Sequence, residues 1–143
     1  MLRTLRWHHR ISEAGPILVK AHELVEQYGI RPYWPYTPLS TSSVPESVVP
    51  DVIAHLVACE SQGRSVKHLD SNHRFSYGVG QIQAGTWSEW SQESGITGDP
   101  MNSVDAVTMM ERAIPHGKLA AWSCAYLLHI LPKPKKPLPV NRM

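Results

Sequence analysis

The spacing of hydrophobic residues predicts two helices in the first half of the chain. Residues 12–29 carry one apolar stripe, and Pro16 suits a first helical turn whereas Gly29 suits the position after a helix end. Residues 30–45 hold four prolines and a Ser/Thr cluster, which predicts an extended linker. Residues 50–61 carry the second stripe at helical spacing, formed by Ile53, Leu56, Val57 and Glu60.

Three more helices are predicted in the second half. Residues 86–89 read Thr-Trp-Ser-Glu, the pattern of a capping box, so we expect a helix from Trp87 onward with Thr86 as its N-cap. Asn102 or Ser103 is expected to cap the next helix. Residues 118–131 are strongly apolar and predict a final helix, which Pro132 stops.

A glycine-rich segment separates these two groups of helices. Within residues 62–85, aromatic and β-branched residues alternate weakly with polar ones from Phe75 to Gln83, which predicts a loop and then a short hairpin. The expected fold is mainly α, of α+β type: a compact helical domain at residues 46–131 with a small β-prone insertion beside a binding cleft. Residues 1–45 form a helical extension with its proline-rich linker, and residues 132–143 form a basic, proline-rich tail that we expect to be disordered.

Composition fits a soluble globular protein, with 42% hydrophobic and 18% charged residues in a chain of 143. Its net charge of +2 is unevenly distributed, because both ends are basic while the middle holds seven Lys/Arg against twelve Asp/Glu. Two interpretations of the basic ends stay open: solvated tails, or arms that touch an anionic polymer. We expect no nucleic-acid partner, since no such motif is present. No transmembrane segment and no secretory signal peptide are expected from the sequence as written.

Glu60 is a candidate catalytic acid because it continues the apolar stripe of residues 50–61. A carboxylate against apolar walls has its charged form disfavoured, and a protonated acid can give a proton to a leaving sugar oxygen. The alternative is a helix-end glutamate that turns to water, and the stripe alone does not exclude it.

Three stretches carry a resemblance to a known family. They are Cys-Glu-Ser-Gln-Gly at residues 59–63, Tyr-Gly-Val-Gly-Gln-Ile-Gln-Ala-Gly-Thr-Trp at residues 77–87, and Gly-Lys-Leu-Ala-Ala-Trp-Ser-Cys at residues 117–124. In this order they resemble the lysozyme-like transglycosylase domain of resuscitation-promoting factors, and more widely the superfamily of lytic transglycosylases and lysozymes. The resemblance covers about residues 48–128.

The resemblance implies a lysozyme-like fold that cleaves the β-1,4 bond between N-acetylmuramic acid and N-acetylglucosamine in peptidoglycan. It implies that Glu60 is the general acid and then the general base, and that Gln81 and Thr86 line the cleft and contact sugar. Tyr77 is a candidate for stacking on a sugar face. From the residues alone, Thr86 can instead be only a helix cap, and Gln81 only a loop residue that bonds to backbone.

The chain also departs from this family. The glycine pair that follows Glu-Ser in the promoting factors is Gln62-Gly63 here, and the acidic position two residues after the loop Gln is Gln83. Asp70, ten residues after Glu60, is either a second catalytic carboxylate, which would permit hydrolysis by water or a covalent intermediate depending on the separation of the pair, or a turn residue.

Cys59 and Cys124 match a disulfide pair of that family, although two buried thiols are the alternative. A disulfide would indicate the cell envelope, the extracellular space or a phage particle as the location. No cofactor and no metal are expected, since no Cys/His cluster has zinc spacing. The leading hypothesis is therefore a peptidoglycan-cleaving enzyme, expected to be a monomer, and the second is a non-catalytic glycan-binding or structural module on the same fold.

Overall fold

The structure, a computed structural model, describes residues 2–133 and the side chains of residues 14–133. This part of the chain contains five α-helices, three short 3-10 helices and one small sheet. The α-helices are α1 (Leu2–Tyr28), α2 (Val49–Ser61), α3 (Ala84–Ser94), α4 (Ser103–Ala113) and α5 (Ser123–Leu127). The 3-10 helices are η1 (Glu46–Val48), η2 (Ile114–His116) and η3 (Leu119–Ala121).

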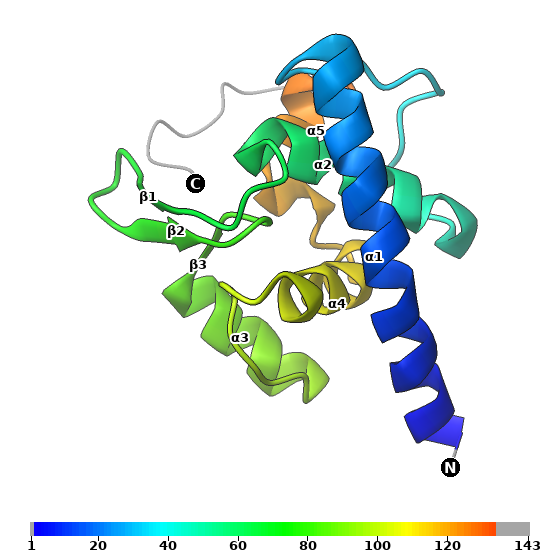
Figure 1. Cartoon of the computed structure of the whole chain (residues 1–143), viewed down its shortest axis with the longest axis vertical. Coiled ribbons are helices and arrows are strands. Elements are labelled where there is room, and N and C mark those ends of the chain that lie inside the picture. The colour runs from blue at the N-terminus through cyan, green and yellow to red at the C-terminus, as the bar shows by residue number, and fades with distance from the viewer. Residues whose placement is uncertain (1, 134–143) are drawn as a thin grey trace.

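The sheet follows α2 and is antiparallel, with strand order β1 (Lys67–Leu69), β2 (Phe75–Tyr77) and β3 (Ile82–Gln83). In Figure 1 it projects from one side of the helical body, opposite the long helix α1. The pairing of His68 with Ser76 sets the register of β1 against β2. A hairpin after α2 was expected from the sequence and is confirmed, with β1 as an additional strand. The protein is thus mainly helical with a small antiparallel sheet.

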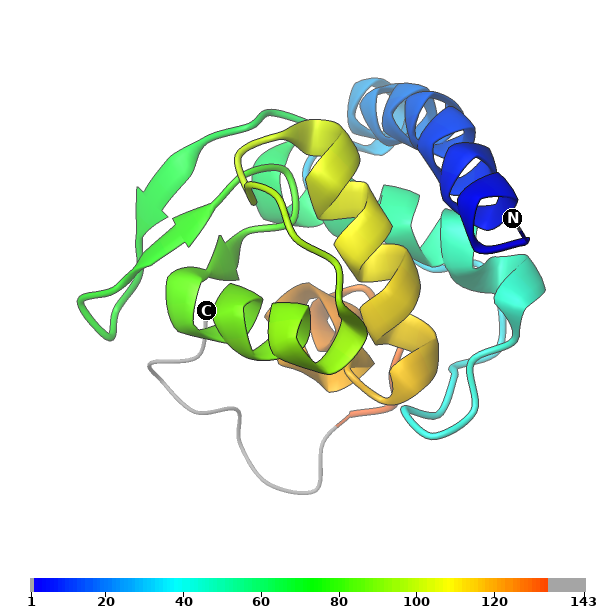
Figure 2. The same ribbon diagram turned by 90° about the horizontal axis from the view of Figure 1, so that it is seen from below.

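Helix α2 lies at the centre of the core. Every residue from Val52 to Ala58 is buried, so this helix is covered on all sides rather than along one stripe. Its neighbours are α1, α4 and α5, and α4 lies between α1 and α3 (Figure 2). A helix that is apolar and buried on every face is held by its neighbours on every face. Helix α2 is therefore a rigid element, and it carries Glu60.

The N-terminal part shares this core. Helix α1 buries a face that includes Ile17, Ala21 and Leu24, as the stripe predicted, whereas Tyr28 is 59% exposed. The predicted start of this helix is wrong, because α1 already begins at Leu2 and Pro16 lies inside it. A proline removes one backbone donor from a helix but does not force it to begin there.

The segment of residues 30–45 is extended, as predicted, but it packs against the body. The Trp34 side chain is 1% exposed, and the Trp34 backbone N–H donates to the Leu128 carbonyl at 3.1 Å. The Leu39 N–H donates to the Ile130 carbonyl at 2.7 Å. These bonds join the segment to residues 128–130, where a helix was expected.

The prediction of one helix over residues 118–131 is wrong. The segment forms η3, then α5 of only five residues. Between them Trp122 is extended, with its indole N–H donating to the Gly80 carbonyl at 2.8 Å. The backbone beyond Leu127 bonds to residues 34 and 39 instead of continuing the helix. A continuous apolar run indicates that a segment is buried but does not specify its conformation. Tertiary contacts therefore decide the conformation of residues 118–131.

The start of α3 also differs from the prediction. The helix begins at Ala84, so Thr86 lies in its first turn and is not the N-cap. The N-cap position belongs to Gln83, whose side chain makes no capping bond. The next cap is confirmed: the Asn102 side chain accepts the Asp105 N–H at 3.0 Å at the start of α4.

The basic ends fall mostly outside the described part. Residues 134–143 of the predicted tail, and the arginine side chains at positions 3, 6 and 10, are not described. Among the described helices, none combines the length and the hydropathy that crossing a bilayer requires.

Candidate active site

Glu60 lies in the last turn of α2, where the helix meets the sheet. The neighbouring Ser61 hydroxyl is buried and bonds to the Val57 carbonyl at 3.1 Å and to the Val79 carbonyl at 2.8 Å. Ser61 thereby ties the end of α2 to the loop between β2 and β3. Gln62 ends the helix at φ 57°, and Gly63 follows at φ 76°. This left-handed pair turns the chain sharply away from Glu60.

A pocket of about 280 Å³ opens beside Glu60. It lies between the end of α2, the segment that follows it, and the face of the sheet that carries His68 and Ser76. Ile30, just after α1, also reaches its wall, so the N-terminal part contributes to the site. The other residues that line it are Cys59, Ser61, Gln62, Arg64, Val66, Asp70 and Gln81.

The carboxylate of Glu60 is half-buried and faces the start of α5. The Cys124 backbone N–H donates to Glu60 Oε2 at 3.4 Å. A disulfide joins Cys59 to Cys124 across 65 positions of sequence, with 6.2 Å between the two Cα atoms. The predicted disulfide is therefore present, and it holds the residue before Glu60 against the helix whose N–H contacts the carboxylate.

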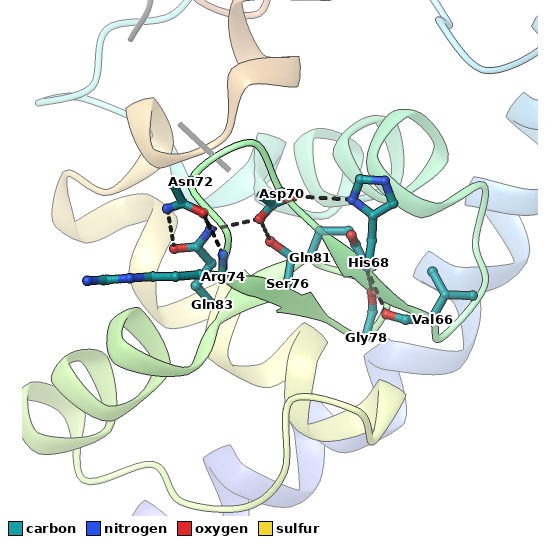
Figure 3. A network of polar contacts seen from close by, with 9 residues as sticks. All are labelled: Val66, His68, Asp70, Asn72, Arg74, Ser76, Gly78, Gln81 and Gln83. Atoms are coloured by element: carbon teal, nitrogen blue, oxygen red, sulfur yellow. Dashed lines mark hydrogen bonds and ion pairs between the residues drawn. The ribbon is translucent and has the colours of Figure 1, made fainter. Parts of the chain in front are cut away.

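Asp70 lies in the turn between β1 and β2 and lines the same pocket as Glu60. Its side chain is 5% exposed. Three side chains contact this carboxylate (Figure 3): the Ser76 hydroxyl donates to Oδ2, the Gln83 amide donates to Oδ2 at 2.7 Å, and His68 Nδ1 lies 3.2 Å from Oδ1. Asp70 is thus a turn residue whose carboxylate lies in the pocket that Glu60 also lines, and a catalytic role for it stays a prediction.

The three residues that contact Asp70 (His68, Ser76 and Gln83) were not predicted as site residues. His68 and Ser76 face the pocket from adjacent strands because they are paired in register. Gln83 reaches Asp70 from the end of β3. The sequence signal that could have found them is the alternation of the strands, which places His68, Ser76 and Gln83 on one face of the sheet once these residues are paired in register.

Gln81 is 5% exposed and lines the pocket, and its contact with sugar stays a prediction of the resemblance. Its amide nitrogen donates to the carbonyls of Val66 and Gly78, each at 2.9 Å. It therefore fastens the loop before β1 to the loop after β2, which is the backbone-bonding role that the residue type alone suggested. Its backbone is left-handed, with φ 50°.

Tyr77 and Thr86 are not among the residues that line this pocket. Tyr77 neighbours Ser76 in β2, so its side chain lies on the opposite face of the hairpin, with Phe75. There the ammonium group of Lys67 lies 4.2 Å from the Phe75 ring centroid and 5.8 Å from that of Tyr77. Thr86 is half-buried in the first turn of α3.

The pocket carries two carboxylates, one imidazole and one guanidinium, supplied by Glu60, Asp70, His68 and Arg64. Such a set can donate and accept protons and can stabilise positive charge. Within the described residues, no cluster of three or more His, Cys, Asp or Glu side chains could hold a metal ion. No protein-family model, curated protein or solved structure matches this chain.

Proposed function

We propose that this chain is a peptidoglycan-cleaving enzyme with a lysozyme-like fold, and that it acts on the bond between N-acetylmuramic acid and N-acetylglucosamine. The observation that carries the proposal is the position of Glu60: half-buried at the end of a buried helix, in a pocket that also contains Asp70. A partly desolvated acid beside a hydrogen-bonded carboxylate is the arrangement that glycosidic cleavage uses.

In the proposed reaction, Glu60 gives its proton to the glycosidic oxygen. The bond between that oxygen and sugar C1 breaks, the electron pair leaves with the oxygen, and positive charge develops at C1. An acceptor hydroxyl then bonds to C1 and returns its proton to the Glu60 carboxylate. Water as the acceptor leaves a reducing muramic end, whereas the muramic C6 hydroxyl leaves a 1,6-anhydro product.

Asp70 supports the version with water as the acceptor. Its carboxylate accepts hydrogen bonds from the Ser76 hydroxyl and the Gln83 amide, and a carboxylate in the pocket can stabilise positive charge at C1. A transglycosylase needs only Glu60. The products therefore report whether Asp70 takes part, and both versions use the same acid.

The disulfide fits the location that peptidoglycan cleavage requires. A cystine persists in oxidising surroundings such as the cell envelope, the extracellular space or the surface of a phage particle. We therefore propose glycan strands of peptidoglycan as the partner. The Cys59–Cys124 bond then keeps the Glu60 region intact outside the reducing cytoplasm.

The test is digestion of purified peptidoglycan by wild type and by the Glu60→Gln variant, with products analysed by mass spectrometry. The substitution keeps the size of the side chain and removes the transferable proton, so we expect a loss of at least about 100-fold in rate. Glu89→Gln is the matched control, because Glu89 is exposed on α3 and lies outside the pocket. It should keep the wild-type rate.

Each result has a defined meaning. Muramic products from wild type and from Glu89→Gln, but not from Glu60→Gln, support the proposal. Equal activity of all three proteins contradicts the role of Glu60. No products from a folded wild type on several wall types would contradict an enzyme and favour a glycan-binding or structural module.

A further inference from the structure

The carboxylate of Asp70 is held by side chains from three places in the sheet. His68 comes from β1, Ser76 from β2, and Gln83 from the end of β3 (Figure 3). Gln83 differs from the other two because its side-chain amide has an NH₂ group, which donates, and an oxygen of almost the same size, which accepts. Only one orientation of this amide places an N–H against the carboxylate.

The backbone of Arg74 fixes that orientation through Asn72. The Arg74 N–H donates to Asn72 Oδ1 at 3.1 Å, so this end of the Asn72 amide must be its oxygen. Asn72 Nδ2 consequently donates to Gln83 Oε1 at 3.3 Å. The opposite end of the Gln83 amide, Nε2, then bonds to Asp70 Oδ2 at 2.7 Å and to Asn72 Oδ1 at 3.2 Å. The turn between β1 and β2 thereby holds a donor against Asp70.

Building on the proposed function, we propose that Gln83 is a positioning residue that holds the Asp70 carboxylate at the Glu60 pocket with an N–H donor. That carboxylate then stabilises the positive charge that develops at sugar C1. Gln83 touches neither the substrate nor Glu60 in this proposal, and it acts only through Asp70. An acceptor or a second carboxylate at this position would face the Asp70 oxygen and oppose its negative charge.

Other charged groups surround Asp70 and must be held constant in any test. Glu60 at the end of α2, Arg64 in the following segment and His68 in β1 line the same pocket. His68 is in direct contact with Asp70, and its side chain is 68% exposed. A change at Gln83 leaves all three of these groups in place.

The experiment compares the pH dependence of peptidoglycan cleavage for wild type, Gln83→Glu and Gln92→Glu. The first variant replaces the donor with a carboxylate next to Asp70. The second makes the same chemical change at an exposed position of α3 outside the pocket, so it controls for the added charge. For Gln83→Glu we expect the acidic limb of the kcat profile to move up by about one pH unit, because like charges resist ionising together. Below that limb, kcat should fall about tenfold while KM changes less than twofold.

A structural role alone predicts a different result. If Gln83 only stabilises the fold, kcat falls by one factor at every pH or does not change, and either outcome overturns the proposal. A shift of equal size in Gln92→Glu also overturns it, since the cause would then be net charge.

Two further measurements test the proposal if the Gln83→Glu variant does not fold or if the wild type shows no activity. If Gln83→Glu does not fold, Gln83→Met removes the donor without adding charge, and a smaller upward shift is expected. Titration of the Asp70 carboxyl carbon by ¹³C NMR needs no activity, and its curve should move to higher pH in either variant. An inactive, folded wild type overturns the proposed function and the role of Gln83 in it. An active wild type with an unmoved Asp70 curve overturns only the role of Gln83.

Discussion

At the scale of single residues, Gly78 is the glycine with the least space for a side chain. It has φ 78°, and a Cβ atom added to it would lie 1.8 Å from the Pro100 carbonyl oxygen. The left-handed backbone costs a non-glycine residue about 1–2 kcal/mol, and overpacking costs roughly 1–3 kcal/mol more. We therefore expect Gly78→Ala to lower the free energy of unfolding by about 3 kcal/mol, as measured by urea denaturation.

Gly85 offers the matched control for that substitution. It lies in the first turns of α3, and nothing lies within 4 Å of an added Cβ atom. Gly85→Ala should leave stability unchanged or raise it by up to about 1 kcal/mol, because alanine favours a helix. A loss of stability at Gly85 as large as that at Gly78 would contradict the steric argument.

The residue scale also shows how far the sequence could predict the site. Glu60 was found because it continues an apolar stripe, and Asp70 because of its spacing from Glu60. Gln83 was noticed only as a departure from the resembled family, since its role depends on a turn that brings Asn72 beside it. Tyr77 was chosen for its residue type, but strand alternation turns it away from the pocket. Spacing along the chain does not reveal which face of a short strand a side chain occupies until the register is known.

At the scale of elements, the Cys59–Cys124 bond joins α2 to α5 across 65 positions. Helix α5 has only five residues, too few to be stable as an isolated helix, so it depends on such connections. In the chain-entropy model, closing a loop of this length contributes roughly 4 kcal/mol. We expect the double variant Cys59→Ala, Cys124→Ala to lose about this amount in the free energy of unfolding.

Reduction provides an independent check of the disulfide prediction. A reducing agent should lower the melting temperature of wild type to near that of the double variant and leave the variant itself unchanged. If wild type keeps its melting temperature after the thiols are shown to be free by alkylation, the bond does not stabilise the fold.

The elements that the sequence predicted well are those with a clear period and a cap. Helix α4 has both, since its apolar face includes Val107 and Met110 and Asn102 caps its start. Residues 118–131 have neither a period nor an internal stop, and there the expected helix was wrong. Their conformation is set by distant partners such as Gly80 and Trp34, which no local pattern contains.

At the scale of the whole molecule, His55 is one of the contacts between the N-terminal part and the central helix. This histidine of α2 is 4% exposed, and its ring meets the Trp34 ring edge-on at 5.0 Å between centroids. Its Nδ1 lies 2.7 Å from the Asp51 carbonyl oxygen, so Nδ1 carries the proton of the neutral ring. His55 thus links the extended segment of residues 30–45 to the central helix, a contact that the separation of these two parts in the sequence gave no reason to expect.

Burial of this ring makes the stability of the molecule depend on pH. Burial lowers the pKa of His55 below its usual value of 6.5, with the bond to the Asp51 carbonyl acting in the opposite direction. The unfolded chain therefore binds a proton at a higher pH than the folded protein, and stability falls as the pH decreases below 6.5 until the folded state is protonated as well. His55→Phe keeps an aromatic ring against Trp34 and cannot titrate. The difference in free energy of unfolding between wild type and this variant should therefore be constant above pH 7. Between pH 6.5 and 5 it should shift in favour of the variant. Urea denaturation at several pH values measures this difference, and a difference that stays constant over the whole range would contradict a neutral, buried His55.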